Sequence, residues 1–171
     1  MVEVPEATRA VDDWRERTSS AKPSAGVPAH VTILFPFVPA RRIDRELLAS
    51  LGSLFAAYPA FGFELREARR FPGLLYLAPE PAERFLELIE AAAAAHPDFP
   101  PYGGEFGTIV PHLTAAEGEA AVLDRAAADI EPSLPIPAVA HEVTLLEEVE
   151  PALARWRSRA RLPLGRRNVR A

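Results

Sequence analysis

Apolar residues recur along the chain with two different periods, one typical of helices and one typical of strands. Helical spacing, as in Val11, Trp14 and Arg15, predicts four helices, at about 6–18, 44–58, 81–96 and 118–130. Alternation, or a short apolar run between turn residues, predicts strands at about 2–4, 30–37, 61–65, 74–77, 107–115, 138–147 and 154–162. The presence of both periods predicts an α+β protein.

Polar and turn residues mark where these elements begin and end. Asp44 can cap the second helix and Pro59 ends it, whereas Pro81 suits the first turn of the third helix. Residues 19–26 are mostly small and include a proline and a glycine, a composition that permits a mobile loop. Residues 100–104, Pro-Pro-Tyr-Gly-Gly, form a second loop that is stiff at first and flexible afterwards.

The same order of elements occurs twice, at about 2–58 and 74–130. Each copy has a strand, a Pro-Glu pair, a helix, a loop, a proline, a strand with a histidine and a threonine, and another helix. The copies match in the order of elements and not residue by residue. We therefore expect a single two-lobed domain over 1–171, built from an internal repeat whose sheets are completed by the strands at 138–162.

Each half places a histidine two residues before a threonine inside an apolar run. These pairs are His30 with Thr32 and His112 with Thr114, and the two histidines are 82 positions apart. Residues i and i+2 of a strand point to the same face, so each imidazole is expected beside its own hydroxyl. Halves that face each other would bring both pairs to one cleft.

The composition narrows the class of protein. A chain of 171 residues with 49% apolar and 25% charged residues fits one soluble globular domain. The lack of cysteine excludes disulfides, cysteine metal sites and thiol nucleophiles, and it suits a cytoplasmic protein. No apolar run has transmembrane length, and the first residues do not resemble a signal peptide, so no membrane partner is expected. The net charge of −5 argues against long nucleic acid as a partner.

Basic residues are concentrated at the end of the chain. From Arg155 onward there are seven arginines and no acidic residue, which leaves 12 basic (19 − 7) against 24 acidic side chains in residues 1–154. Arginines alternate along the predicted strand at 154–162, as expected for a solvated face. The other hypothesis is that Arg157 reaches the cleft and binds phosphate.

Other interpretations of the histidines are weaker. A zinc site usually needs three protein ligands, and no matching histidine spacing occurs, so no metal is expected. His96 lies at a predicted helix C-terminus, where a cation is favoured, and is interpreted as structural. His141 shares a predicted strand face with apolar residues and is interpreted in the same way. Chance occurrence of two His-x-Thr pairs, one in each half and each after a proline, is improbable.

Two longer motifs carry a family resemblance. They are Pro-Ala-His30-Val-Thr32-Ile-Leu-Phe-Pro-Phe and Pro-Tyr-Gly-Gly followed by Pro-His112-Leu-Thr114. With them the chain resembles the 2H phosphoesterase superfamily, and within it bacterial proteins similar to 2′-5′ RNA ligase and RNA 2′,3′-cyclic phosphodiesterase. The resemblance runs from Val2 to about Gly165. It implies a duplicated, pseudo-two-fold α+β fold with antiparallel sheets, helices packed outside, a central cleft, and neither metal nor cofactor.

The resemblance also implies an activity and roles for residues. The activity would be hydrolysis of a 2′,3′-cyclic phosphate on an RNA end or a small cyclic nucleotide, or 2′-5′ ligation by the reverse reaction. His30 and His112 would be the general acid–base pair, because an imidazole titrates near neutrality. Thr32 and Thr114 would donate hydrogen bonds to the phosphate oxygens. Which histidine is the acid stays open.

Aromatic residues add candidate substrate contacts. Tyr102, Phe37, Phe71 and Phe106 could stack on a nucleobase or could belong to the core. Tyr102 is the strongest candidate because its Pro/Gly loop precedes the second motif. Phe37 and Arg157 are the other candidate substrate contacts. A monomer is expected. A binding module that holds a nucleotide in the same cleft without turnover, and a structural or partner-binding protein, are the alternatives to an enzyme.

Overall fold

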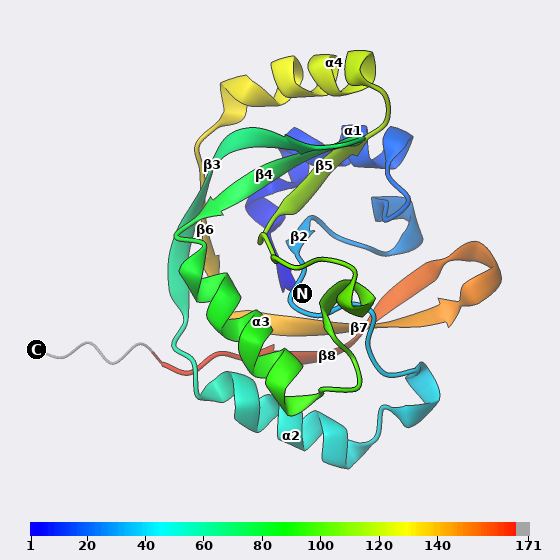
Figure 1. Ribbon diagram of the computed structural model, residues 1–171, viewed down its shortest axis with the longest axis vertical. Helices are drawn as coiled ribbons and strands as arrows, with labels where there is room; N and C mark the ends of the chain where they lie inside the picture. Colours follow the sequence, from blue (N-terminus) through cyan, green and yellow to red (C-terminus); the bar gives the residue numbers. More distant parts are fainter. Residues whose placement is uncertain (167–171) are drawn as a thin grey trace, which may run out of the picture.

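The computed structural model describes residues 1–166 and contains both helices and strands (Figure 1). The helices are α1 (Thr8–Thr18), α2 (Arg45–Ala56), α3 (Glu83–Ala95) and α4 (Ala120–Ile130). The strands are β1 (Val2–Glu3), β2 (His30–Val31), β3 (Phe61–Phe71), β4 (Leu74–Glu80), β5 (Leu113–Glu117), β6 (Ile136–Ala140), β7 (Glu142–Glu150) and β8 (Arg155–Pro163). The predicted α+β class is confirmed.

All strand pairs are antiparallel, as predicted, and they form two layers. One layer is a four-stranded sheet with the order β5-β4-β3-β6. The other contains the pairs β1-β2 and β7-β8. Met1 and Thr144 join these two pairs. The N-terminal ammonium of Met1 donates to the carbonyl of Thr144 at 3.0 Å, and the backbone N–H of Thr144 donates to the carbonyl of Met1 at 2.8 Å. The second layer therefore runs β2-β1-β7-β8, with β2 and β5 at corresponding ends of the two layers.

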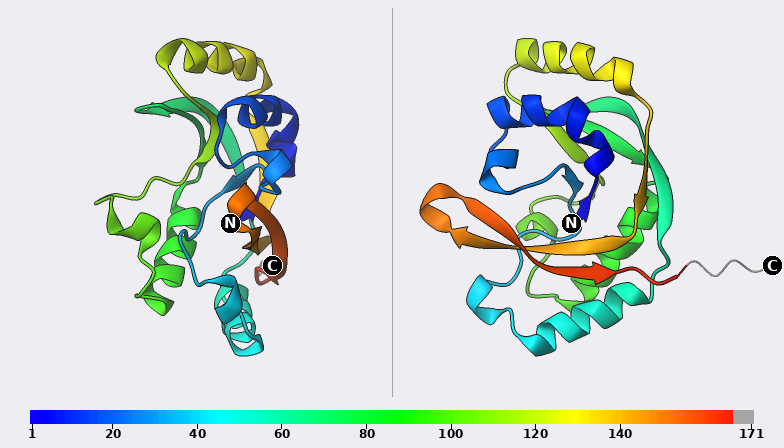
Figure 2. Two further views of the ribbon diagram at one scale, coloured as in Figure 1. Left: turned by 90° about the vertical axis from the view of Figure 1, so that its right-hand side faces the viewer. Right: turned by 180° about the vertical axis from the view of Figure 1, so that it is seen from behind.

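The helices lie outside the strands in two pairs. α1 and α4 contact β5 and lie together above the four-stranded sheet, and the view from behind shows α1 across the back of that sheet (Figures 1 and 2). α2 contacts β8 and α3 on the opposite side of the molecule. The successions β1-α1-β2-α2 and β4-α3-β5-α4 have the same order, which is the order that the proposed internal repeat requires.

A continuous apolar core joins the two layers. Phe85 of α3 is fully buried and its ring meets Phe61 and Phe63 of β3 edge-on, with centroids 5.1 and 4.9 Å apart. Leu77 and Leu113 are also fully buried, on neighbouring strands of the four-stranded sheet. Burial of such side chains contributes about 1.5–3 kcal/mol each and fixes the strands that carry the two motifs.

Two predicted strand boundaries are wrong. The segment predicted as one strand at 138–147 forms β6 and β7, which belong to different sheets and are separated at His141. Apolar alternation runs through both strands, so the change of sheet leaves no signal in the pattern. The strand predicted at 61–65 continues to Phe71, because a bulge between Leu65 and Glu67 lets a charged segment stay paired with β4.

The strands around the two motifs are also shorter than predicted. β2 contains only His30 and Val31, because its partner β1 has two residues, and the chain after it is irregular. The second motif enters its sheet at Leu113, so His112 immediately precedes β5. Each histidine thus lies at the start of a paired strand: His30 is the first residue of β2, and His112 is the residue before β5.

Candidate active site

Both His-x-Thr pairs show the same alternation of burial. The histidine and the threonine are partly exposed, whereas the apolar residues beside them are buried. In the first motif the buried residues are Ala29, Val31 and Ile33, and in the second they are Pro111, Leu113 and Ala115. The apolar side chains face the core, so His30 and Thr32 share the opposite face, as do His112 and Thr114.

The two imidazoles are held in the same way. Nδ1 of His30 lies 2.8 Å from the carbonyl oxygen of Pro28, and Nδ1 of His112 lies 2.8 Å from that of Val110. A carbonyl can only accept, so the hydrogen-bond geometry assigns the proton of each neutral ring to Nδ1. Nε2 then carries the free lone pair, and each ring offers that atom as a proton acceptor, or as a donor once protonated.

Burial makes both imidazoles weak bases. It is the main cause that lowers the pKa of His30 to about 3, and the positive charges of the Met1 ammonium, Arg15 and His112 add to it. Burial also lowers the pKa of His112, against the opposing effect of its bond to Val110.

Aromatic rings surround His112. Phe71 and Tyr76 approach its imidazole with centroids 5.4 and 5.5 Å away, and they stack on each other at 4.3 Å. The ring of Tyr102 lies 6.4 Å from His112 and nearly parallel to it. Of the candidates from the sequence, Phe71 and Tyr102 therefore lie at the second motif.

Tyr102 connects the two motifs. Its backbone N–H donates to the carbonyl of Phe35, five residues after His30, at 2.6 Å. A hydrogen bond with the Thr32 side chain lowers the pKa of Tyr102, but burial raises it more. Tyr102 has a φ of 52°, a left-handed conformation that is costly for a tyrosine. This strained backbone places the side chain between Thr32 and His112.

The pattern of this chain matches a known family. A model of the 2′-5′ RNA ligase superfamily matches residues 3–152. The chain belongs to this superfamily. This confirms the resemblance that the two motifs indicated, since the superfamily is a family of 2H phosphoesterases. A search of curated proteins returned no significant match.

Solved structures share the fold of this superfamily member. Escherichia coli LigT complexed with 3′-AMP is 19% identical, with a TM-score of 0.58, and the match covers 96% of this chain and 95% of LigT. LigT complexed with NADP+ is 20% identical, with a TM-score of 0.55 and the same coverage. A crystal structure of a phosphoesterase is 17% identical, with a TM-score of 0.53 and 96% coverage of both chains. Identities this low show a common fold.

Two candidate substrate contacts have other partners in this superfamily member. Phe37 packs edge-on against His96 and Phe99, with centroids 5.0 and 5.5 Å away. Nε of Arg157 donates to the carboxylate of Glu147 at 2.6 Å, and that carboxylate is only 7% exposed. Arg157 is thus engaged within the β7-β8 hairpin, whose far end projects from the body (Figure 2). Of the seven arginines near the end of the chain, Arg167 and Arg170 lie outside the described residues.

Sequence reasoning missed two aromatic residues, Phe35 and Trp156, which pack against each other. The Phe35 ring, 52% exposed, lies 6.3 Å from that of Trp156 on β8, and the Phe106 ring, 59% exposed, lies 5.7 Å from that of Tyr102. Phe106 was among the stacking candidates, whereas Phe35 and Trp156 were not. Phe35 stands inside the first motif, so its position in the sequence was the available signal. Trp156 is on a distant strand, and only the fold brings it close.

An open groove of about 830 Å³ adjoins the second motif. It lies between β3, β4, β6 and the start of α3, and it reaches Val110 and Pro111. Arg66 in its wall pairs with Glu64 and Glu80, at 2.9 and 3.0 Å. The groove is lined by Val110 and Pro111, the two residues before His112, and by neither of the histidines nor their threonines.

Within residues 1–166, no three His, Cys, Asp or Glu side chains are grouped so that they could hold a metal ion. No helix in that part of the chain is long and apolar enough to cross a membrane.

Proposed function

We propose that this protein is a metal-independent phosphodiesterase that hydrolyses 2′,3′-cyclic phosphates, on RNA ends or on small nucleotides. The observation that carries the proposal is the matched pair of imidazoles: each has Nδ1 bound to a backbone carbonyl and Nε2 free, on a face shared with a threonine. Membership of the 2′-5′ RNA ligase superfamily supports it. So does the fold shared with LigT, whose crystal structures hold 3′-AMP, ATP and NADP+.

The pair of histidines supplies one base and one acid. In the free protein, lowered pKa values favour the neutral form of both rings at pH 7. An anionic phosphate bound between them favours the imidazolium form of one ring. The neutral Nε2 takes a proton from water as its oxygen bonds to phosphorus. The other Nε2–H gives its proton to the ribose oxygen as the phosphorus–oxygen bond breaks.

Neighbouring side chains would stabilise the substrate. The hydroxyls of Thr32 and Thr114 donate to the non-bridging oxygens, where negative charge increases in the transition state. Tyr102 lies between the two motifs and contacts the base or the ribose. Arg157 and Phe37 are engaged elsewhere, so we leave them out of the proposed site. The reverse reaction, 2′-5′ ligation, would use the same groups with their roles exchanged.

The test is turnover of 2′,3′-cyclic nucleotides in excess EDTA, for wild type, His30→Ala and His112→Ala. His141→Ala is the matched control, because that side chain is exposed between β6 and β7. Hydrolysis in EDTA that both variants lose and the control keeps is the expected result. Loss of activity in EDTA would contradict the metal-independent mechanism. Binding without turnover, unaffected by either substitution, would favour a nucleotide-binding module instead.

The size of the substrate can be tested in the same assay. The groove beside Pro111 offers room for nucleotides beyond the reacting phosphate, whereas the net charge of −5 favours small substrates. The comparison is of kcat/KM for a cyclic mononucleotide and for an oligonucleotide with the same terminus. A higher value for the oligonucleotide would indicate an RNA-end substrate, and a higher value for the mononucleotide a small one. We further propose that the protein acts in the cytoplasm as a monomer without a cofactor.

A further inference from the structure

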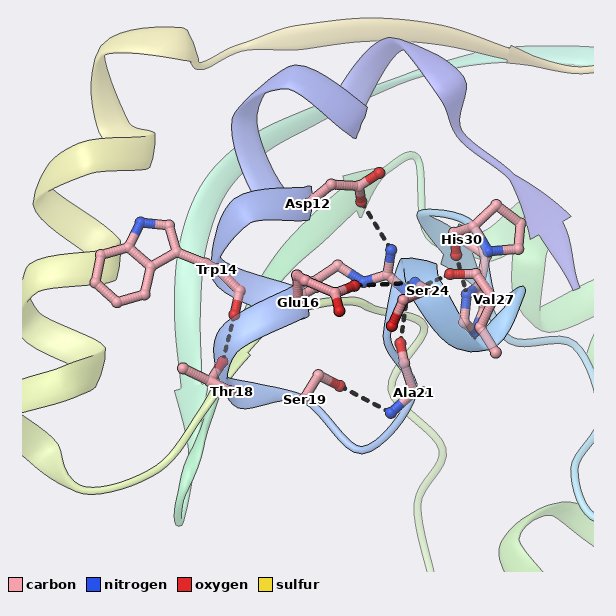
Figure 3. A network of polar contacts seen from close by, with 11 residues as sticks. Asp12, Trp14, Glu16, Thr18, Ser19, Ala21, Ser24, Val27 and His30 are labelled. Atoms are coloured by element: carbon pink, nitrogen blue, oxygen red, sulfur yellow. Dashed lines mark hydrogen bonds and ion pairs between the residues drawn. The ribbon is translucent and has the colours of Figure 1, made fainter. Parts of the chain in front are cut away.

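Arg15 on α1 is a buried cation. It is 1% exposed, and its guanidinium has three bonded partners: the carboxylate of Asp12 at 2.8 Å, the carbonyl of Ala21 at 2.7 Å and the carbonyl of Val27 at 3.0 Å. Figure 3 labels these three partners and His30. Burying a charge costs several kcal/mol unless it is paired and fully hydrogen-bonded. An arginine at this position therefore requires these partners, and two of them are backbone groups of the loop that leads to His30.

The carbonyl of Val27 is next to the one that orients His30. The following carbonyl, of Pro28, accepts the bond from Nδ1 of His30 at 2.8 Å. Arg15 thus holds the peptide unit adjoining the one that fixes the imidazole. On the other side of the Pro28 carbonyl, β2 pairs with β1 through Val31 and His30, and the backbone N–H of Val4 donates to the carbonyl of Ala29 at 2.8 Å. The Pro28 carbonyl thus lies between a segment held by Arg15 and a segment held by β1.

The loop that precedes His30 is also attached to the strand of the second motif. The hydroxyl of Ser19 donates to the carboxylate of Glu117 at 2.6 Å, and the backbone N–H of Glu117 donates to the Thr18 hydroxyl at 3.1 Å. Glu117 is the last residue of β5, which carries Thr114. Residues 19–26, which the sequence allowed to be mobile, therefore form a fixed connection between the two motifs.

We propose that Arg15 is a positioning residue: it holds the imidazole of His30, through the Val27 carbonyl, in the orientation that presents Nε2 to the substrate. The proposal rests on the acid–base role proposed for His30. The second motif differs, because Val110, which accepts the bond from His112, is 37% exposed and open to solvent. The sequence places Arg15 on the apolar face of α1, and this was the signal that it is buried.

Arg15 also acts on the charge of His30. After burial, the positive charges of the Met1 ammonium, Arg15 and His112 each lower the pKa of His30. The carboxylate-bearing residue Glu3 lies opposite His30 in the β1-β2 register. Loss of the Arg15 cation, with these other groups kept, therefore raises the pKa of His30.

The experiment follows the imidazole of His30 directly, by long-range ¹H–¹⁵N NMR spectra of ¹⁵N-histidine-labelled protein over a range of pH. The variant is Arg15→Met. The matched control is Arg17→Met, on the same helix, because Arg17 is exposed and its guanidinium lies over the Trp14 ring. We expect Arg15→Met to lower the Nδ1–H fraction of His30 and raise its pKa. We also expect kcat for a cyclic nucleotide to fall roughly 10- to 100-fold with little change in KM. The control should match wild type.

A second variant keeps the test decisive if Arg15→Met does not fold. Arg15→Lys retains the charge, but its shorter side chain has one nitrogen in place of the two, Nη1 and Nη2, that reach Asp12 and the two carbonyls. The lysine cannot keep all three bonds, so the Nδ1–H fraction should fall while the pKa of His30 stays near the wild-type value. A His30 ring with wild-type tautomer and titration in the folded variants would overturn the proposal, whatever their stability. The spectra require no turnover, so an inactive wild-type protein would count against the proposed function and leave this test intact.

Discussion

Replacing His30 with asparagine should remove much of the protein's loss of stability in acid. Burial lowers the pKa of His30 from 6.5 to about 3 on folding. Between these values the unfolded chain binds the proton and the folded chain does not. The free energy of unfolding therefore falls as the pH drops from 6.5 towards 3, and His30 stabilises the fold fully only above pH 6.5. Asparagine cannot titrate, and its side-chain amide can still donate to the carbonyl of Pro28.

The size of the effect follows from the two pKa values. At about 1.36 kcal/mol for each pKa unit, acidification from pH 7 to pH 4 costs about 3 kcal/mol through His30. The ring is partly exposed, so solvent screens some of this penalty, and we expect about 1.5–3 kcal/mol.

The assay is urea denaturation of wild type, His30→Asn and His141→Asn at several pH values from 4 to 7. The drop in unfolding free energy from pH 7 to pH 4 should be smaller in His30→Asn by the amount given above. His141 is exposed, so its substitution should leave the wild-type drop unchanged. Parallel curves for wild type and His30→Asn, within about 0.5 kcal/mol, would refute the assignment of a buried neutral imidazole.

Three further substitutions test the site and the fold. Thr114→Val keeps the shape but removes the hydroxyl, so kcat for a cyclic nucleotide should fall about 100- to 1000-fold with an unchanged melting temperature; an unchanged kcat would exclude a phosphate contact. Phe85→Ala should lower the free energy of unfolding in urea by about 3–5 kcal/mol, since the ring is fully buried. Gly26→Ala should cost more than about 2 kcal/mol in the same assay, because φ is +83° and the added Cβ would lie 2.0 Å from the carbonyl oxygen of Trp156. A loss below 0.5 kcal/mol would contradict that close approach.

Local signals in the sequence predicted local structure well. Asp44 was expected to cap a helix, and its side chain accepts from the backbone N–H of Leu47 at 2.8 Å. Each histidine was expected to share a face with its threonine, and the burial pattern of both motifs agrees. Such features depend on residues a few positions apart, so the sequence carries enough information to predict them.

Contacts between distant segments could not be predicted in this way. The ion pair of Arg157 with Glu147 depends on the register of β7 and β8, which shifts at a bulge between Leu145 and Leu146. The left-handed conformation of Tyr102 depends on a bond to a loop in the other half. Neither a bulge nor a hydrogen bond between distant segments produces a periodic pattern in the sequence. Both arise from tertiary packing.

The two motifs are alike in local geometry but are held by ladders of different length. β2 pairs with β1 at two positions, whereas β5 has four register pairs with β4. The backbone amide of Val31 should therefore exchange with deuterium through local opening, and the hydrogen-bonded amides of the β5 residues that pair with β4 only through rarer, larger openings of the core. A ligand that spans both motifs would hold the first against the second. The protection gained on binding should then appear mainly around Val31, which makes hydrogen exchange a reporter of occupancy.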